Sequence, residues 1–186
     1  VGTEIDSAAL ASAAAIVYSN PGLDVALELR LQNDPGLILK GVVQAGERFD
    51  LTLCNPPFHA SAAEAAQGSA RKWQNLGRGS SAKSRPARNF GGHAHELWCR
   101  GGELAFVRQL ISESAELAAS ACWFTSLISD GAHLAPLKQQ IHKAVAYSQS
   151  IAMTQGQKQS RFLAWSFLDA GQRQAWRVER WSGAGG

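Results

Sequence analysis

The motif Asn55-Pro56-Pro57-Phe58 constrains the fold of this chain more than any other stretch. It follows the strand-like run 49–54. Its two prolines fix φ and lack N–H donors, and a residue that precedes a proline favours an extended conformation. We therefore expect the chain to leave a buried strand here as a rigid, extended elbow that holds its carbonyl groups still as hydrogen-bond acceptors.

Such an elbow suits the recognition of a flat group that carries an NH2. The side-chain carbonyl of Asn55 and the main-chain carbonyl of Pro56 can each accept one of its hydrogens, while the ring of Phe58 stacks on the base. Taken alone, the four residues are equally compatible with a proline-rich turn that places Phe58 in the core. The other segments of the chain decide between these interpretations.

Several further blocks occur in the order found in one family. They are Asn89-Phe90-Gly91-Gly92, Glu96-Leu97-Trp98-Cys99, Gly101-Gly102-Glu103, Trp123-Phe124-Thr125-Ser126-Leu127 and 155–162. With the motif at Asn55, which resembles motif IV of S-adenosylmethionine-dependent amino-methyltransferases, the chain from about residue 1 to 167 resembles the large-subunit (23S) ribosomal RNA adenine-N6 methyltransferases of the RlmF type. The eukaryotic methyltransferase of spliceosomal small nuclear RNA is a more distant relative. The resemblance implies that Asn55, Pro56, Pro57 and Phe58 are catalytic, and that Asn55 also contacts the cofactor.

The N-terminal segment contains a candidate cofactor site. Residues 1–6 read as the end of a strand, and a helix is expected from Ser7 to the stop at 20–22. A carboxylate at a strand tip can accept hydrogen bonds from both ribose hydroxyls of a nucleotide cofactor. Glu4 has that position, although Glu4 and Asp6 also suit a helix N-terminus as charges that complement its dipole. The resemblance places Glu4 and Ile5 in an S-adenosylmethionine site, with Asp34 near the adenine; a simple turn also explains Asp34.

Methyltransferases of this fold hold the cofactor with a Gly-rich turn just upstream of the acidic strand, and no such turn precedes Glu4. We therefore expect the first strand and its Gly-rich cofactor loop to be missing. Their loss would leave a gap in the middle of the sheet. We expect the chain to be an N-terminally truncated fragment that is inactive alone.

The segment 65–95 is basic and contains no acidic residue. Its composition predicts a mobile loop, either a solvated insertion or a clamp for RNA phosphates. Its place directly after the elbow favours the clamp, with these candidate RNA-binding residues: Arg71, Lys72, Arg78, Lys83, Arg85 and Arg88.

Composition limits the remaining function classes. With 186 residues and 45% hydrophobic content, the chain is long enough for one domain. No apolar run approaches the roughly 20 residues of a membrane span. We expect no secretory leader, and the histidines lack metal-ligand spacing. The three cysteines are odd in number and widely spaced, which favours reduced thiols and a cytoplasmic location. A net charge of +3 favours an anionic partner. We expect a monomer that needs no metal and no membrane.

The remaining periodicity predicts an α/β fold. Strands are expected at 25–31, 122–128, 149–153 and 161–167, the last two as an antiparallel hairpin joined by a turn at 154–160, and helices at 103–120 and 134–145. This order corresponds to a Rossmann-like class I methyltransferase three-layer sandwich with a C-terminal antiparallel hairpin. We assign residues 1–169 to one partial methyltransferase domain and 170–186 to a C-terminal tail. Of two interpretations of the tail, a truncated sheet edge or a further RNA contact, we favour the sheet edge.

The resemblance predicts methyl transfer from S-adenosylmethionine to the N6 amino group of an adenine in large-subunit ribosomal RNA. Two alternatives remain. The same elbow serves enzymes that methylate a glutamine amide in release factors, and a non-catalytic RNA-binding remnant could keep the fold alone. The basic loop and the Gly91-Gly92 block favour RNA over a release factor.

Overall fold

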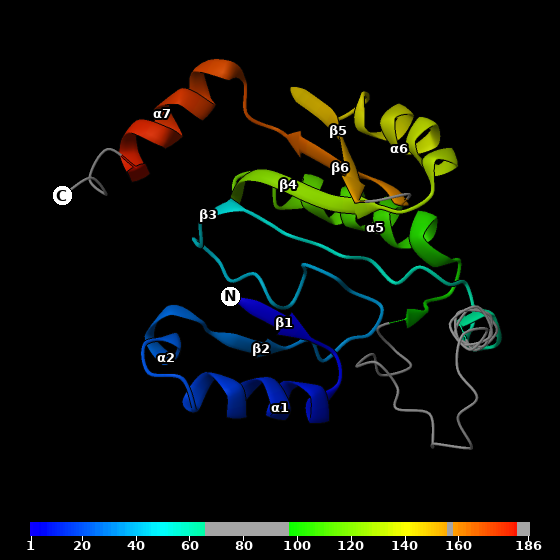
Figure 1. The fold of residues 1–186 in the computed structure, drawn as a ribbon. Helices are drawn as coiled ribbons and strands as arrows, with labels where there is room; N and C mark the ends of the chain where they lie inside the picture. Colours follow the sequence, from blue (N-terminus) through cyan, green and yellow to red (C-terminus); the bar gives the residue numbers. More distant parts are fainter. Residues whose placement is uncertain (66–96, 156–157, 182–186) are drawn as a thin grey trace.

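The computed structural model describes residues 1–65, 97–155 and 158–181. The described strands form two sheets, a parallel pair β1-β2 and a four-stranded sheet in the order β3-β4-β6-β5 (Figure 1). The chain runs through β1 (Gly2–Glu4), α1 (Ser7–Tyr18), α2 (Leu23–Ala26), β2 (Leu29–Leu31), β3 (Phe49–Leu51), α5 (Gly102–Glu116), β4 (Ala121–Ile128), η2 (Gly131–His133), α6 (Leu134–Ile141), β5 (Tyr147–Gln155), β6 (Lys158–Ser166) and α7 (Ala170–Trp181). Among these residues, no helix is both long and apolar enough to cross a bilayer.

The N-terminal segment folds largely as its sequence predicts. Strand β1 pairs in parallel with β2, and α1 packs against this pair. Asp6 caps α1, because its carboxylate accepts a hydrogen bond from the N–H of Ala8 at 2.8 Å. The predicted start of this helix at Ser7 is confirmed.

The strand predicted at 25–31 is wrong in its first half. Gly22 has a left-handed φ of 93°, which turns the chain into the short helix α2 before β2 begins. Only Leu29–Leu31 pairs as a strand. Alternation of apolar and polar residues was therefore a correct signal at the end of this segment and a misleading one at its start.

The four-stranded sheet delivers the elbow. Strand β3 runs parallel to β4, and hydrogen bonds continue past it, from Thr52 N to Trp123 O at 2.9 Å and from Leu127 N to Cys54 O at 2.9 Å. The extended run 49–54 is thus confirmed up to Asn55. Strand β6 pairs antiparallel with both β4 and β5, so the predicted hairpin is confirmed, with longer strands and a shorter connection than expected.

Helices α5 and α6 cover one face of this sheet and form the core with it. The buried apolar side chains are Val107, Leu110, Ile111, Ala121, Phe124, Ile128, Leu137, Ile141, Leu163 and Trp165. The indole N–H of the buried Trp165 donates to Ser114 Oγ of α5 at 2.9 Å, so its polar atom is satisfied inside the core. Both helices lie where they were predicted, and each ends earlier than expected.

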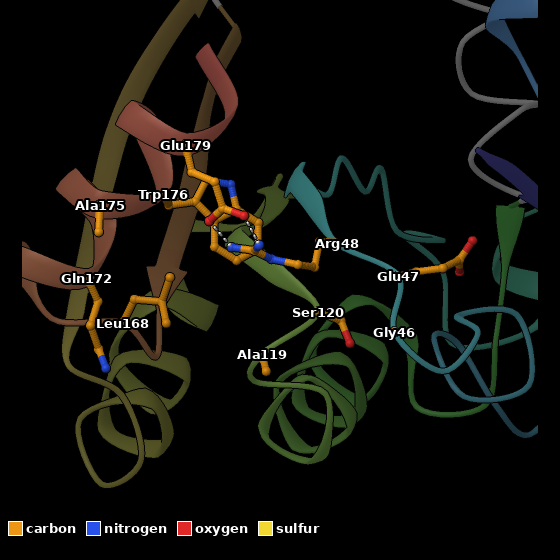
Figure 2. Close-up of a pocket in the computed structure, with 10 residues that line it drawn as sticks. All are labelled: Gly46, Glu47, Arg48, Ala119, Ser120, Leu168, Gln172, Ala175, Trp176 and Glu179. Carbon is orange, nitrogen blue, oxygen red and sulfur yellow. Dashed lines mark hydrogen bonds and ion pairs between the residues drawn. The ribbon is translucent and has the colours of Figure 1, made fainter. Parts of the chain in front are cut away.

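Residues 170–181 form helix α7, so the truncated sheet edge expected there is wrong. Asp169 and Gln172 exchange hydrogen bonds between side chain and backbone, both at 2.8 Å, which starts the helix with a reciprocal cap. Trp176 is buried and donates to Asp50 Oδ1 at 2.8 Å. Figure 2 shows the Arg48–Glu179 ion pair beside Trp176; this contact ties α7 to the start of β3.

Candidate functional site

A cavity of about 530 Å³ lies where the tip of β1, the turn after β2 and the elbow after β3 meet. Its volume is in the range of small-molecule sites. It is lined by Thr3, Glu4, Ile5, Gln32, Pro35, Gly36, Ile38, Asn55, Pro57, Trp98, Cys99, Arg100, Ala105, Phe106 and Gln109. The cavity therefore joins Glu4 and Ile5, two of the predicted cofactor residues, to Asn55 and Pro57 of the predicted catalytic elbow. Pro56 and Phe58 of the elbow are not among its lining residues.

Glu4 presents an oriented carboxylate to this cavity. Its Oε1 atom accepts hydrogen bonds from the backbone N–H groups of Ile5 at 2.7 Å and Asp6 at 3.0 Å. Its Oε2 atom has no hydrogen-bond partner within 1–65, 97–155 and 158–181. Since Asp6 caps α1, Glu4 is not needed as a helix cap, and within the described part of the chain nothing else binds its second oxygen.

The elbow has rigid and open parts. Pro56 and Pro57 are buried, whereas Asn55 is exposed and lines the cavity. Phe58 is half-buried and lies outside the core cluster, so the interpretation of Phe58 as a core residue receives no support. The prolines thus anchor the backbone, while Asn55 is exposed at the cavity.

Two neighbouring segments hold the elbow in place. On one side it continues the ladder with β4; on the other, His59 N donates to Leu97 O and Cys99 N donates to His59 O, both at 3.1 Å. Gly102 follows with a left-handed φ of 64°, and a Cβ there would lie 3.4 Å from Phe58 O. The sequence block Gly101-Gly102-Glu103 is therefore the point where α5 approaches the elbow closely.

Comparison with known proteins identifies the family. A family described as RNA methyltransferase matches residues 1–169. The chain belongs to this family. It is 53% identical over 185 residues to ribosomal RNA large subunit methyltransferase F of Pseudomonas putida (strain W619), and 52% identical to the protein of that name in Pseudomonas entomophila (strain L48). In each case the match covers 99% of this chain and spans 58% of the relative's length.

Solved structures confirm the Rossmann-like fold of this chain. The hMettl16 catalytic domain, crystallised with the MAT2A 3'UTR hairpin 1, superposes with a TM-score of 0.69 at 26% identity. That match covers 90% of this chain and 55% of the other. The resemblance inferred from the elbow and the accompanying blocks is thus confirmed at the level of family and fold.

Asp34 does not line the cavity. Its carboxylate accepts a hydrogen bond from the N–H of Gly36 at 2.8 Å, which makes it a turn residue. Its neighbours Pro35 and Gly36 do line the cavity. The turn after β2 therefore contributes backbone to the site while the Asp34 side chain stabilises the turn.

Burial raises the pKa of the two thiols near the site. Burial raises the pKa of Cys54 to about 11, against a smaller opposing effect of a hydrogen bond with Ser126, so this thiol stays protonated near neutral pH. Burial also raises the pKa of Cys99. Within the described parts of the chain, no group of three or more His, Cys, Asp or Glu residues is arranged to hold a metal ion.

Several lining residues were not assigned a role from the sequence. Arg100 brings a cation and Phe106 an aromatic ring to the cavity, and Gln109 brings an amide. The indole N–H of Trp98 is buried without a hydrogen-bond partner in the described structure. Trp98 lies in a recognised sequence block. The positions of Phe106 and Gln109 on the cavity side depend on how α5 packs, and Arg100 lies just before that helix. The six predicted RNA-binding residues, Arg71, Lys72, Arg78, Lys83, Arg85 and Arg88, lie outside the described residues.

Proposed function

We propose that this chain is part of an enzyme that transfers a methyl group from S-adenosylmethionine to the N6 amino group of an adenine in large-subunit ribosomal RNA. The observation that carries the proposal is one cavity lined by Glu4, Asn55 and Pro57. The Glu4 carboxylate, which can accept hydrogen bonds from ribose hydroxyls, and Asn55, whose carbonyl can accept one from an amino group, thereby border the same cavity. The family and the names of the relatives support an RNA substrate.

The N-terminal side of the cavity fits the cofactor. The available Oε2 of Glu4 suits ribose hydroxyls, which are hydrogen-bond donors, and the exposed Ile5 beside it offers an apolar surface. When bound, S-adenosylmethionine supplies an electrophilic methyl group. The chain's own task is to hold the acceptor in line with it.

The elbow acts on the amino group. Asn55 Oδ1 and the main-chain oxygen of Pro56 accept the two N6 hydrogens, which favours a geometry in which the nitrogen lone pair leaves conjugation with the ring. The Phe58 ring stacks on the adenine. After the new N–C bond forms, N6 releases one proton to water. Methyl transfer requires no side chain with a shifted pKa, because the acceleration comes from the orientation of the reacting groups and from these two hydrogen-bond acceptors.

The RNA around the target adenine requires a positive surface. We assign phosphate contacts to the basic segment that follows the elbow, with Arg71, Lys72, Arg78, Lys83, Arg85 and Arg88 as its cations. A related catalytic domain of 26% identity was crystallised with an RNA hairpin, which supports RNA as the partner. The same proposal places the enzyme in the cytoplasm with its ribosomal RNA substrate, as a monomer.

The test is methylation of ribosomal RNA fragments by the intact protein carrying Asn55→Ala. Turnover should fall by about a hundredfold or more while the fold is retained, since the lost acceptor acts mainly in the transition state. Asn20→Ala is the matched control, because the Asn20 amide donates to Ile16 O at the end of α1, outside the cavity. Unchanged turnover in Asn55→Ala contradicts the mechanism, and methylation of a release-factor glutamine in place of RNA contradicts the substrate.

A further inference from the structure

Helix α5 carries two buried carboxylates, those of Glu103 and Glu113. The two residues are only 1% and 4% exposed to solvent, respectively. A buried carboxylate is stable only where hydrogen-bond donors satisfy it. Each of these two accepts backbone N–H groups from a different loop. The ten-residue separation places the two carboxylates about 15 Å apart along the helix.

Glu103 fixes the first turn of α5 to the end of β4. Its Oε1 atom accepts hydrogen bonds from the Ser129 backbone N–H and hydroxyl, both at 2.6 Å. Its Oε2 atom lies 2.6 Å from His133 Nδ1 and 3.3 Å from the backbone nitrogen of Asp130. Because Gly102 is the preceding residue and packs on the backbone of Phe58, Glu103 also sets where the helix meets the catalytic elbow.

Glu113 fixes the loop after β2 to the same helix. Its carboxylate accepts hydrogen bonds from the backbone N–H groups of Ile38, Leu39 and Lys40 at 2.7–3.2 Å. Gln109, one turn earlier, donates to Glu113 Oε1 at 2.8 Å and to Gly36 O. Gly36 and Ile38 line the cavity, so the hydrogen bonds of Glu113 and Gln109 position the part of the cavity wall that follows β2.

The link by Glu113 matters because the two sheets are separate. In the described structure no strand of β1-β2 pairs with β3 or β4. Arg30 supplies another link, to Glu47 at 2.5 Å. Helix α5 itself is held by fully buried Val107, Leu110 and Ile111, which makes it a rigid support for both carboxylates.

We propose that Glu103 and Glu113 are positioning residues that set the two sides of the cavity from one helix. Glu103 places the acceptor elbow, and Glu113 places the side that holds the methyl donor. This inference rests on the proposed function. It predicts different kinetic effects, because a misplaced elbow slows the transfer step, whereas a misplaced donor side weakens donor binding.

The test compares Glu103→Gln and Glu113→Gln in the intact protein. Glu103→Gln should lower kcat about tenfold to a hundredfold with the KM for S-adenosylmethionine changed less than about twofold. Glu113→Gln should raise that KM about tenfold with kcat nearly retained. Glu116→Gln is the matched control on the same helix, since Glu116 is exposed and pairs only with Lys40 among the described residues; both constants should stay unchanged.

Two further measurements separate positioning from simple loss of fold. Ser129→Ala removes one donor to Glu103 without removing a buried charge, and it should repeat the kcat effect more weakly. Calorimetric titration of S-adenosylmethionine should show weaker binding for Glu113→Gln and unchanged binding for Glu103→Gln. Parallel losses of kcat and donor affinity in both variants overturn the inference. If the wild-type protein binds the donor and methylates no RNA, the proposed function fails, while the titration still tests Glu113.

Discussion

Gly102→Ala tests how closely the elbow depends on its neighbour. Gly102 has a φ of 64°, and a left-handed conformation costs an L-residue roughly 1–2 kcal/mol. The added Cβ would also lie 3.3 Å from Ala60 N and 3.4 Å from Phe58 O. These atoms flank His59, whose backbone is hydrogen-bonded to Leu97 and Cys99, so the contact is relieved only if the elbow shifts by a few tenths of an ångström.

Gly46→Ala provides the matched control. Gly46 has a similar φ of 81°, and apart from its chain neighbours no heavy atom of the described residues lies within 4 Å of its Cβ position. Both substitutions therefore carry the backbone strain, which corresponds to a decrease in Tm of roughly 2–8 °C in a chain of this size. Only Gly102→Ala carries the contact with the elbow. Its decrease in Tm should be larger, and its turnover should fall by about tenfold or more, since small displacements of reacting groups slow transfer strongly.

Thermal unfolding and steady-state methylation of ribosomal RNA fragments by the intact protein measure the two effects. Gly46→Ala should lose stability and keep kcat, whereas Gly102→Ala should lose both. If the two variants lose equal stability and neither loses turnover, the close approach of Gly102 does not position the elbow.

Three further predictions follow from the site. Phe58→Ala should weaken RNA binding by roughly 1–3 kcal/mol through lost stacking, whereas Phe58→Tyr should bind almost normally; equal RNA affinity of all three proteins in a binding titration would argue against stacking. The 186-residue chain alone should bind S-adenosylmethionine feebly in calorimetry, because Glu4 is the one ribose acceptor proposed among the described residues; tight binding would mean that the cofactor site lies elsewhere. Burial raises the pKa of Glu113, but hydrogen bonds from Gln109 and from the backbone of residues 38–40 outweigh the effect of burial and hold the pKa below 4.5. The ionised Glu113 carboxylate therefore stabilises the fold above pH 4.5, and this stabilisation is lost as the pH falls through the lowered pKa of the folded state. Urea unfolding should therefore show a smaller acid-induced loss of stability in Glu113→Gln than in the wild type, and equal losses would contradict this.

The sequence by itself determined the locally encoded elements. Consecutive prolines required the elbow at Asn55, and Asp6 started α1, because both effects act within a few residues. The hairpin β5-β6 also followed from short-range alternation. The cap formed by Asp169 and Gln172 is equally local. The sequence therefore contained the signal for the start of α7, although this helix was not predicted.

Only the tertiary structure showed how the residues of the site come together. Glu4 and Asn55 lie far apart in the chain and meet in one cavity only because β1, β2 and β3 end near one another. Glu103 and Glu113 look like exposed helix charges in the sequence, and only packing shows them buried against two loops. The physical reason is that caps and prolines act through neighbouring backbone, whereas the burial of a charge depends on which distant N–H groups the fold brings to it.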